Sequence, residues 1–71
     1  MNCNKTDLAS IGKRIKTARE NCNMKQEDLA EKLYCKRELI SYYENGNRYI
    51  KTDTLINLSK ILNVSADYLL G

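Results

Sequence analysis

The sequence predicts an all-α fold, and three features support this prediction. Apolar residues recur three and four positions apart, as they do on one face of a helix. No segment alternates apolar and polar residues in the manner of a half-buried strand. Glycine or asparagine follows the apolar runs where helices would end, at Gly46 and Asn63. At 71 residues the chain is expected to form one compact domain of five helices, near the size at which one core barely suffices.

The first helix is expected from about Asp7 to Asn21. Its apolar stripe at helical spacing consists of Ile11, Ile15, Ala18 and Cys22. The opposite side carries Lys13, Lys16 and Glu20 and should face water. Residues 1–6 precede this helix and are expected to form a flexible tail that includes Cys3.

The next two helices are expected at Gln26–Leu33 and Arg37–Asn45. Their apolar faces are marked by Leu29, Ala30 and Leu33 and by Ile40 and Tyr43. The break between them is so short that both faces can be buried only if the helices cross steeply. This arrangement is the helix-turn-helix plan, which places one helix in a DNA groove. A plain helical hairpin would give a similar pattern, so the spacing leaves that alternative open.

The C-terminal part is expected to add a loop and two helices. Residues 46–51 form the loop, and the fourth helix spans about Asp53 to Leu62. Its apolar face consists of Leu55, Leu58 and Leu62. A short fifth helix follows, which Ser65 caps and in whose first turn Asp67 is well placed.

Composition argues against enzymatic, metal and membrane functions. The sequence has no histidine, and its three cysteines lack a CxxC spacing, so we expect no metal, no cofactor and no catalysis. Reduced thiols in the cytoplasm are expected, with Cys22 and Cys35 acting as small apolar residues. No run approaches the ~20 apolar residues of a membrane span, and no secretion signal is visible. The net charge of +3 permits a polyanionic partner.

Helical geometry divides the helix at residues 37–45 into two faces. Ile40 and Tyr43 point toward the core, whereas the opposite direction is taken by Glu38, Ser41, Tyr42 and Asn45, with Arg37 and Leu39 beside them. These side chains suit base reading: arginine can bind guanine O6 and N7, and glutamate can accept from cytosine N4. Tyr42 can lie against a thymine methyl or bind phosphate, and Ser41 can reach either target. A solvated helix face is the alternative interpretation.

The runs QEDLAEKL, ELISYYENG and TDTLINLSKILNVSADYLL resemble the phage lambda repressor and Cro-type helix-turn-helix family, which comprises xenobiotic-response-element-like transcription regulators. The resemblance spans about Ile11 to Leu70. It implies a compact five-helix domain whose third helix lies in the major groove, with base-reading positions at Arg37, Glu38 and Tyr42. The implied function is sequence-specific binding of double-stranded DNA by a transcription regulator, a repressor of phage or mobile-element type. Because some members are antitoxins, a protein-interaction module of a toxin–antitoxin pair is the alternative.

The resemblance also suggests which residues bind phosphate. Gln26 matches the family's phosphate-binding glutamine, and Asn45, Asn47 and Arg48 follow the third helix. Lys25 and Lys36 stand where the family usually has a capping serine or threonine. We hypothesise that both lysines give up the cap for phosphate contact. The alternative is that they are tolerated surface residues, with the caps supplied by Asn23 or water.

Three further expectations come from the family. Arg19 and Glu44 should form a structural ion pair that orients the third helix. Tyr34 occupies a turn position that is usually glycine, and must either adopt a left-handed conformation or reshape the turn; Ile50 replaces a frequent proline. The domain should bind a near-palindromic operator as a homodimer. An apolar patch for dimerisation is expected at Ile56, Tyr68 and Leu70, although scattered surface residues would look the same. No small-molecule effector site is visible.

Overall fold

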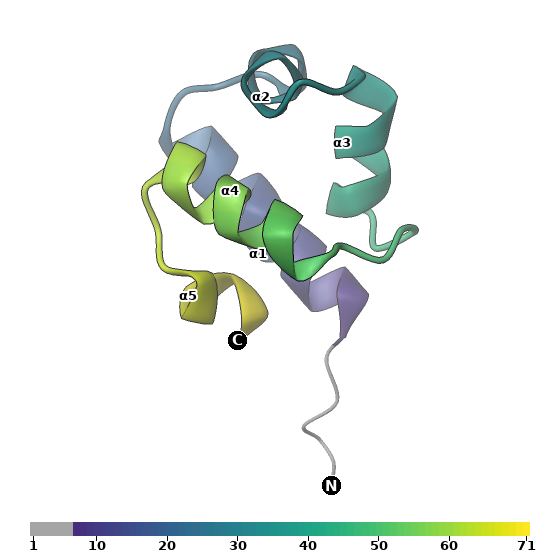
Figure 1. Cartoon of the computed structure of the whole chain (residues 1–71), viewed down its shortest axis with the longest axis vertical. Coiled ribbons are helices and arrows are strands. Elements are labelled where there is room, and N and C mark those ends of the chain that lie inside the picture. The colour runs from purple at the N-terminus through teal and green to yellow at the C-terminus, as the bar shows by residue number, and fades with distance from the viewer. Residues whose placement is uncertain (1–6) are drawn as a thin grey trace, which may run out of the picture.

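The computed structural model describes residues 7–71 of the chain, and this part consists of five helices without strands (Figure 1). The helices are α1 (Leu8–Asn21), α2 (Gln26–Leu33), α3 (Arg37–Glu44), α4 (Thr52–Leu62) and α5 (Ala66–Leu70). The all-α prediction is therefore confirmed, and each helix boundary lies within about a residue of the expected one. The predicted tail of residues 1–6, with Cys3, lies outside the described residues.

The helices surround one apolar core. In Figure 1 α4 lies in front of α1, α5 lies below them, and α2 and α3 close the remaining sides. The core residues are Ile11, Ile15, Ala18, Leu29, Ala30, Ile40, Tyr43, Ile50, Leu55, Leu58, Leu62 and Leu69. Every described helix contributes to this set, and Ile50 enters it from the loop before α4. Ile50 thus replaces the family's usual proline with a buried side chain.

The two helices of the predicted helix-turn-helix cross steeply. In Figure 1 α2 is seen along its axis, whereas α3 lies in the plane of the picture. Leu29 and Ala30 on α2, and Ile40 and Tyr43 on α3, are all buried. The crossing lets both short helices bury an apolar face while the other side of α3 stays exposed.

A close approach of α3 to α1 depends on glycine at position 12. A Cβ atom placed on Gly12 would lie 2.5 Å from the carbonyl oxygen of Glu44, which is too close for any side chain. Gly46 serves the same contact: it has φ +74, and its Cβ would lie 2.8 Å from the Cα of Ala9. The C-terminal end of α3 is therefore held against the first turns of α1 by two positions that require glycine.

Three helices end at non-glycine residues in the left-handed conformation, namely Asn23, Tyr34 and Asn63. After α2 the N–H of Cys35 donates to the carbonyl of Ala30 at 2.9 Å, as in a Schellman ending. Tyr34 therefore adopts the left-handed conformation, with φ 59, rather than reshaping the turn. Its side chain is 96% exposed, so no buried contact explains the tyrosine.

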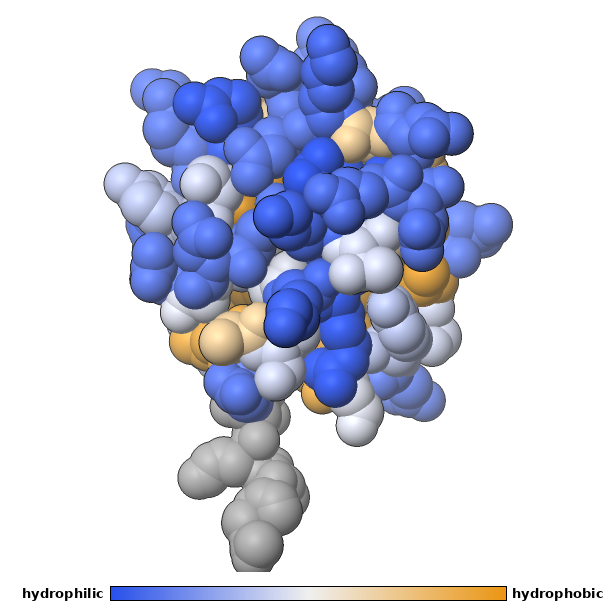
Figure 2. Space-filling model, turned by 180° about the vertical axis from the view of Figure 1, so that it is seen from behind, coloured by the Kyte–Doolittle hydropathy of each residue, from blue (hydrophilic) through white to orange (hydrophobic). Residues whose placement is uncertain are grey.

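The surface opposite to the view of Figure 1 is predominantly hydrophilic, with apolar side chains only in small separate areas (Figure 2). This agrees with the expected polar side of α1, where Lys13, Lys16 and Glu20 are exposed. Within residues 7–71, no helix is long and apolar enough to cross a membrane.

Candidate DNA interface

A buried ion pair joins α1 to the end of α3. The Nε atom of Arg19 lies 2.6 Å from Oε2 of Glu44, and both residues are more than nine-tenths buried. Arg19 Nη2 donates to Glu44 Oε1 at 3.3 Å, and Nη1 donates to the carbonyl of Met24 at 2.7 Å. The guanidinium therefore binds one carboxylate through two nitrogens and also secures the turn after α1, a geometry that fixes both partners. The pair expected from the family resemblance is present.

Two further hydrogen bonds extend this pair to the exposed surface. The side-chain amide of Gln26, at the start of α2, donates to Glu44 Oε1 at 3.0 Å. Its oxygen accepts from Arg37 Nη1 at 3.1 Å. Because the Gln26 amide binds a carboxylate at one end, its oxygen is turned toward Arg37. A continuous chain of polar contacts thus runs from Arg19 in the interior to Arg37 on the surface. We refer to these four residues, Arg19, Glu44, Gln26 and Arg37, as the polar relay.

The exposed side of α3 contains the side chains expected to read bases. Arg37, Glu38 and Tyr42 are exposed and Ser41 is half-buried, whereas Ile40, Tyr43 and Glu44 are buried. Tyr42 is 46% exposed, which is a large apolar area on a helix face that is otherwise polar. The division of α3 into a buried edge and an exposed edge follows the helical spacing of the sequence.

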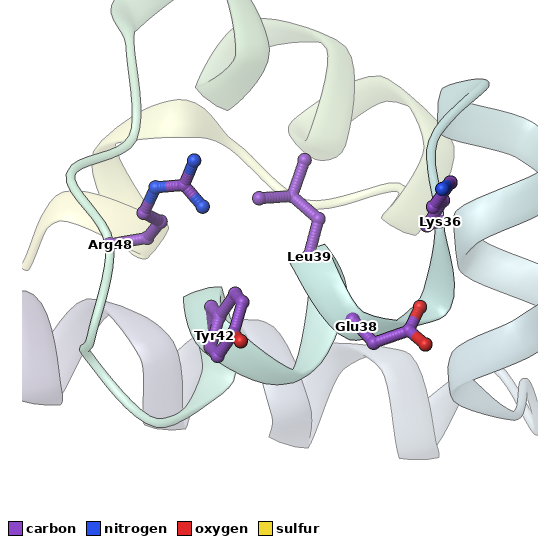
Figure 3. A pocket seen from close by; sticks show the side chains of 5 residues that line it. All are labelled: Lys36, Glu38, Leu39, Tyr42 and Arg48. Atoms are coloured by element: carbon purple, nitrogen blue, oxygen red, sulfur yellow. The ribbon is translucent and has the colours of Figure 1, made fainter.

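A hollow lies on this exposed face between α3 and the loop that follows it. It is lined by Lys36, Glu38, Leu39, Tyr42 and Arg48 (Figure 3). The guanidinium carbon of Arg48 lies 5.8 Å from the centre of the Tyr42 ring, a cation–π distance. Leu39, which the sequence placed only beside the base-reading residues, points into this hollow (Figure 3). Its apolar side chain gave no signal for a polar ligand.

The N-termini of α3 and α4 lack side-chain caps. Lys36 precedes α3 and Lys51 precedes α4, and neither side chain caps its helix. Lys51 was not predicted as a site residue, although a lysine immediately before an apolar helical run could have indicated it. Uncapped N-termini present backbone N–H groups and a positive dipole end, which suit a phosphate.

The start of α2 differs from the other two and corrects one expectation. The backbone N–H of Lys25 donates to Oδ2 of Asp28 at 3.0 Å, which is the carboxylate half of a capping box. Asn23, which was offered as a possible cap, instead ends α1 in the left-handed conformation with φ 58. No hydrogen bond from the Asn23 side chain to the start of α2 is present among the described residues, whereas Asp28 supplies one. The sequence could have indicated this capping contact, because Asp28 is an acidic residue three positions after Lys25.

The segment after α3 places Asn45, Asn47 and Arg48 on the surface. The backbone N–H of Asn47 donates to the carbonyl of Tyr42 at 2.9 Å, so the chain folds back against α3. Asn45 Nδ2 donates to Ser41 Oγ at 3.4 Å, one helical turn earlier. Arg48 reaches the hollow of Figure 3, whereas Asn47 does not line it.

The proposed dimer residues lie on α4 and α5, whereas the two described cysteines follow α1 and α2. Ile56, Tyr68 and Leu70 are exposed on α4 and α5 rather than in the core. Cys22 and Cys35 are half-buried free thiols, and Cys22 Sγ lies 3.3 Å from the carbonyl of Leu62. Burial raises the pKa of the Cys35 thiol above its ordinary value, which keeps it protonated and a poor nucleophile.

Comparison with known proteins identifies the class. The Helix-turn-helix family model matches residues 15–69, most of the chain. The chain belongs to the lambda repressor and Cro-type helix-turn-helix family of DNA-binding transcription regulators.

Particular relatives are similar over most of the chain. It is 48% identical over 62 residues to the HTH-type transcriptional regulator ImmR of Bacillus subtilis, covering 87% of this chain and 49% of that protein. The HTH-type transcriptional activator BcrR of Enterococcus faecalis is 38% identical over 61 residues, covering 86% of this chain and 30% of BcrR. The chain thus spans about half or less of the length of these curated relatives.

Solved structures share the fold. The restriction-modification controller protein C.AhdI from Aeromonas hydrophila has a TM-score of 0.83 at 25% identity, covering 89% of this chain and 96% of that one. Hydroxypropylphosphonic acid epoxidase from S. wedmorenis has a TM-score of 0.87 at 25% identity, but this chain covers only 36% of it. The fold therefore also occurs as one part of an enzyme, and the function of this chain must be argued from its surface.

Proposed function

We propose that this domain binds double-stranded DNA in a sequence-specific manner, with α3 in the major groove. The observation that carries the proposal is the polar relay, which connects the interior ion pair to an exposed arginine at the start of α3. A solvated arginine would gain nothing from such support. An arginine that must meet guanine O6 and N7 at fixed positions gains pre-organisation.

In this docking Arg37, Glu38 and Tyr42 read base edges, and Ser41 reaches a base or a phosphate. Arg37 is fixed by Gln26, while the Tyr42 ring lies against the Arg48 guanidinium. Glu38 accepts from cytosine N4, and its charge disfavours other registers in which it would meet a phosphate. The three side chains emerge from one exposed helix edge, which is the placement that groove recognition requires.

Phosphate contacts fix the register on both sides of α3. Lys25, Gln26 and Lys36 act at the N-terminal side, and Asn45, Asn47 and Arg48 act beyond the C-terminal end. Lys51 joins this second group through the uncapped N-terminus of α4. Along these residues cations outnumber the carboxylate Glu38, so the face complements a polyanion.

We further propose that two copies bind a near-palindromic operator, since one short helix reads only a few base pairs. The exposed side chains of Ile56, Tyr68 and Leu70 supply the apolar contact between the copies. Repression follows where the operator overlaps a promoter, because the bound pair excludes other proteins from the groove. We also propose that the protein acts in the cytoplasm and that residues 1–71 form one DNA-binding domain.

Salt-dependent binding to duplex DNA tests the proposal. Sequences enriched from a random duplex pool are measured by fluorescence anisotropy at several salt concentrations. With ~6–10 phosphate contacts per dimer, affinity should fall by ~10³–10⁵ between about 50 and 200 mM salt. Absence of any enriched sequence, or affinity that does not depend on salt, contradicts groove docking.

A further inference from the structure

The hollow on α3 has an apolar floor and a charged rim. Leu39 and Tyr42 form the floor, and Lys36, Glu38 and Arg48 stand around it (Figure 3). Lys36 and Arg48 lie at opposite ends of the hollow, and the Glu38 carboxylate is directed toward the Lys36 end. A ligand that fits must therefore place an apolar group at the centre, and negative charge on it is best accommodated beside the cations Arg48 and Lys36.

We propose that this hollow receives the 5-methyl group of a thymine, an inference that rests on the proposed docking of α3. That methyl is the only apolar group on the major-groove edge of unmodified base pairs. Phosphates lie on both sides of the groove, which matches the cations at the two ends of the hollow. The 5-methyl of 5-methylcytosine has the same chemistry, so the experiment must separate the two sources.

Arg48 prepares the hollow for this ligand. Its guanidinium lies 5.8 Å from the centre of the Tyr42 ring, so the ring packs against a cation before DNA is present. The contact favours this orientation of Tyr42, in which the ring adds an apolar surface beside Leu39. The contact also links α3 to the loop that follows it at one end of the hollow, because Arg48 comes from that loop (Figure 3).

The position of Glu38 indicates which base lies beside this thymine. It lies one helical turn before Tyr42 and lines the same hollow. A carboxylate accepts from cytosine N4 but faces the O4 acceptor of thymine unfavourably. The recognised half-site should therefore contain a thymine beside a cytosine, with the thymine at the Leu39–Tyr42 end of the hollow.

A uracil scan of the enriched duplex tests the assignment with the unaltered protein. Each thymine is replaced in turn by deoxyuridine, which removes only the methyl group, and dissociation constants are measured by anisotropy. One thymine per half-site should show a loss of about fourfold, the expected effect of one lost buried methyl. If no uracil position weakens binding while sequence preference persists, the inference is overturned and the proposed function stands. If no sequence is enriched at all, the proposed function itself has failed.

A second arm identifies the side chains and the source of the methyl. In the Leu39→Ala and Tyr42→Ala variants, replacing that thymine by deoxyuridine should no longer weaken binding. We call the loss of affinity on this replacement the uracil penalty. Tyr49→Ala, which removes an exposed tyrosine outside the hollow, should leave the penalty unchanged. Cytosines are also replaced by 5-methylcytosine one at a time, and binding should not tighten. Tighter binding at one methylated cytosine without a uracil penalty would overturn the assignment to thymine.

Discussion

At the residue scale, the buried carboxylate of Glu44 accepts hydrogen bonds from two side chains. It binds Arg19 on one side and the Gln26 amide on the other, at the end of the helix proposed to read DNA. Family resemblance predicted the ion pair, but its continuation through Gln26 to Arg37 could not be predicted. Side-chain directions across three helices depend on the crossing of α2 and α3, and spacing alone does not fix this crossing in detail.

Glu44→Gln should lower the free energy of unfolding by ~3–5 kcal/mol, because the buried Arg19 would lose its buried opposite charge and keep only the exposed Glu20 carboxylate. Urea denaturation measures the change. Glu20→Gln is the matched control, since the Glu20 carboxylate is exposed and lies 3.9 Å from the same arginine. An exposed pair contributes ~0–1 kcal/mol, so this variant should resemble the parent. Equal stability of the two variants would contradict a structural role for the buried pair.

Tyr34→Gly should raise the free energy of unfolding by up to about 1 kcal/mol, because glycine adopts the left-handed conformation without a Cβ penalty but loses more entropy on folding. Asn63→Gly provides the comparison at a second left-handed helix end, and its gain should be smaller because asparagine tolerates this conformation. Thermal unfolding ranks the variants. A destabilised Tyr34→Gly protein would show that the tyrosine makes a contact worth more than the backbone strain.

At the scale of the element, helix type and core face followed directly from the spacing of apolar residues. Leu55, Leu58 and Leu62 lie where a period of 3.6 places them, and α4 is buried on that side. What spacing could not supply is the approach of one helix to another. Gly12 gave no signal in the sequence, because the need for glycine arises only where the end of α3 meets α1. Leu39 was missed as a site residue for a similar reason, since the hollow depends on Arg48 from the next loop.

Lys25→Ser and Lys36→Ser should each raise the melting temperature, because serine supplies a cap worth ~0.5–2 kcal/mol where lysine supplies none. Both should also weaken DNA binding, because each removes a cation from the proposed phosphate contacts. Thermal unfolding and anisotropy on the same samples measure the two effects. A variant that gains both stability and affinity would contradict the proposal that these lysines contact the phosphate backbone.

At the scale of the whole molecule, the domain has a small apolar core and an exposed edge of α3. Hydrogen bonds from buried residues position this edge. The core holds α1, α4 and α5 together, while glycine contacts and the polar relay fix α3 relative to them. Composition predicted a single small domain and permitted a polyanionic partner. The exposed edge of α3 could be predicted residue by residue, but the surface that it forms with its neighbours could not, because the loop and the helix N-termini meet α3 only in three dimensions.

The dimer belongs to this scale. The enriched duplex should contain two half-sites with centres one helical turn apart, about 10–10.5 base pairs, or a multiple of it. Ile56→Asp should weaken binding to the full site and leave the weak binding of an isolated half-site nearly unchanged. Analytical ultracentrifugation on DNA gives the stoichiometry. A single protein copy bound to the full site would contradict the dimer.

We propose above all that the exposed edge of α3 reads bases, with Arg37 as the main contact. The most direct measurement is the base preference of Arg37→Ala at every operator position, compared with that of Lys60→Ala. The control removes a positive charge in the last turn of α4, on the side of the molecule away from α3 (Figure 1). Arg37→Ala should lose ~1–3 kcal/mol of discrimination at one base pair, while Lys60→Ala should keep the parental preferences. Unchanged preferences in Arg37→Ala, with affinity lowered equally for all sequences, would contradict it.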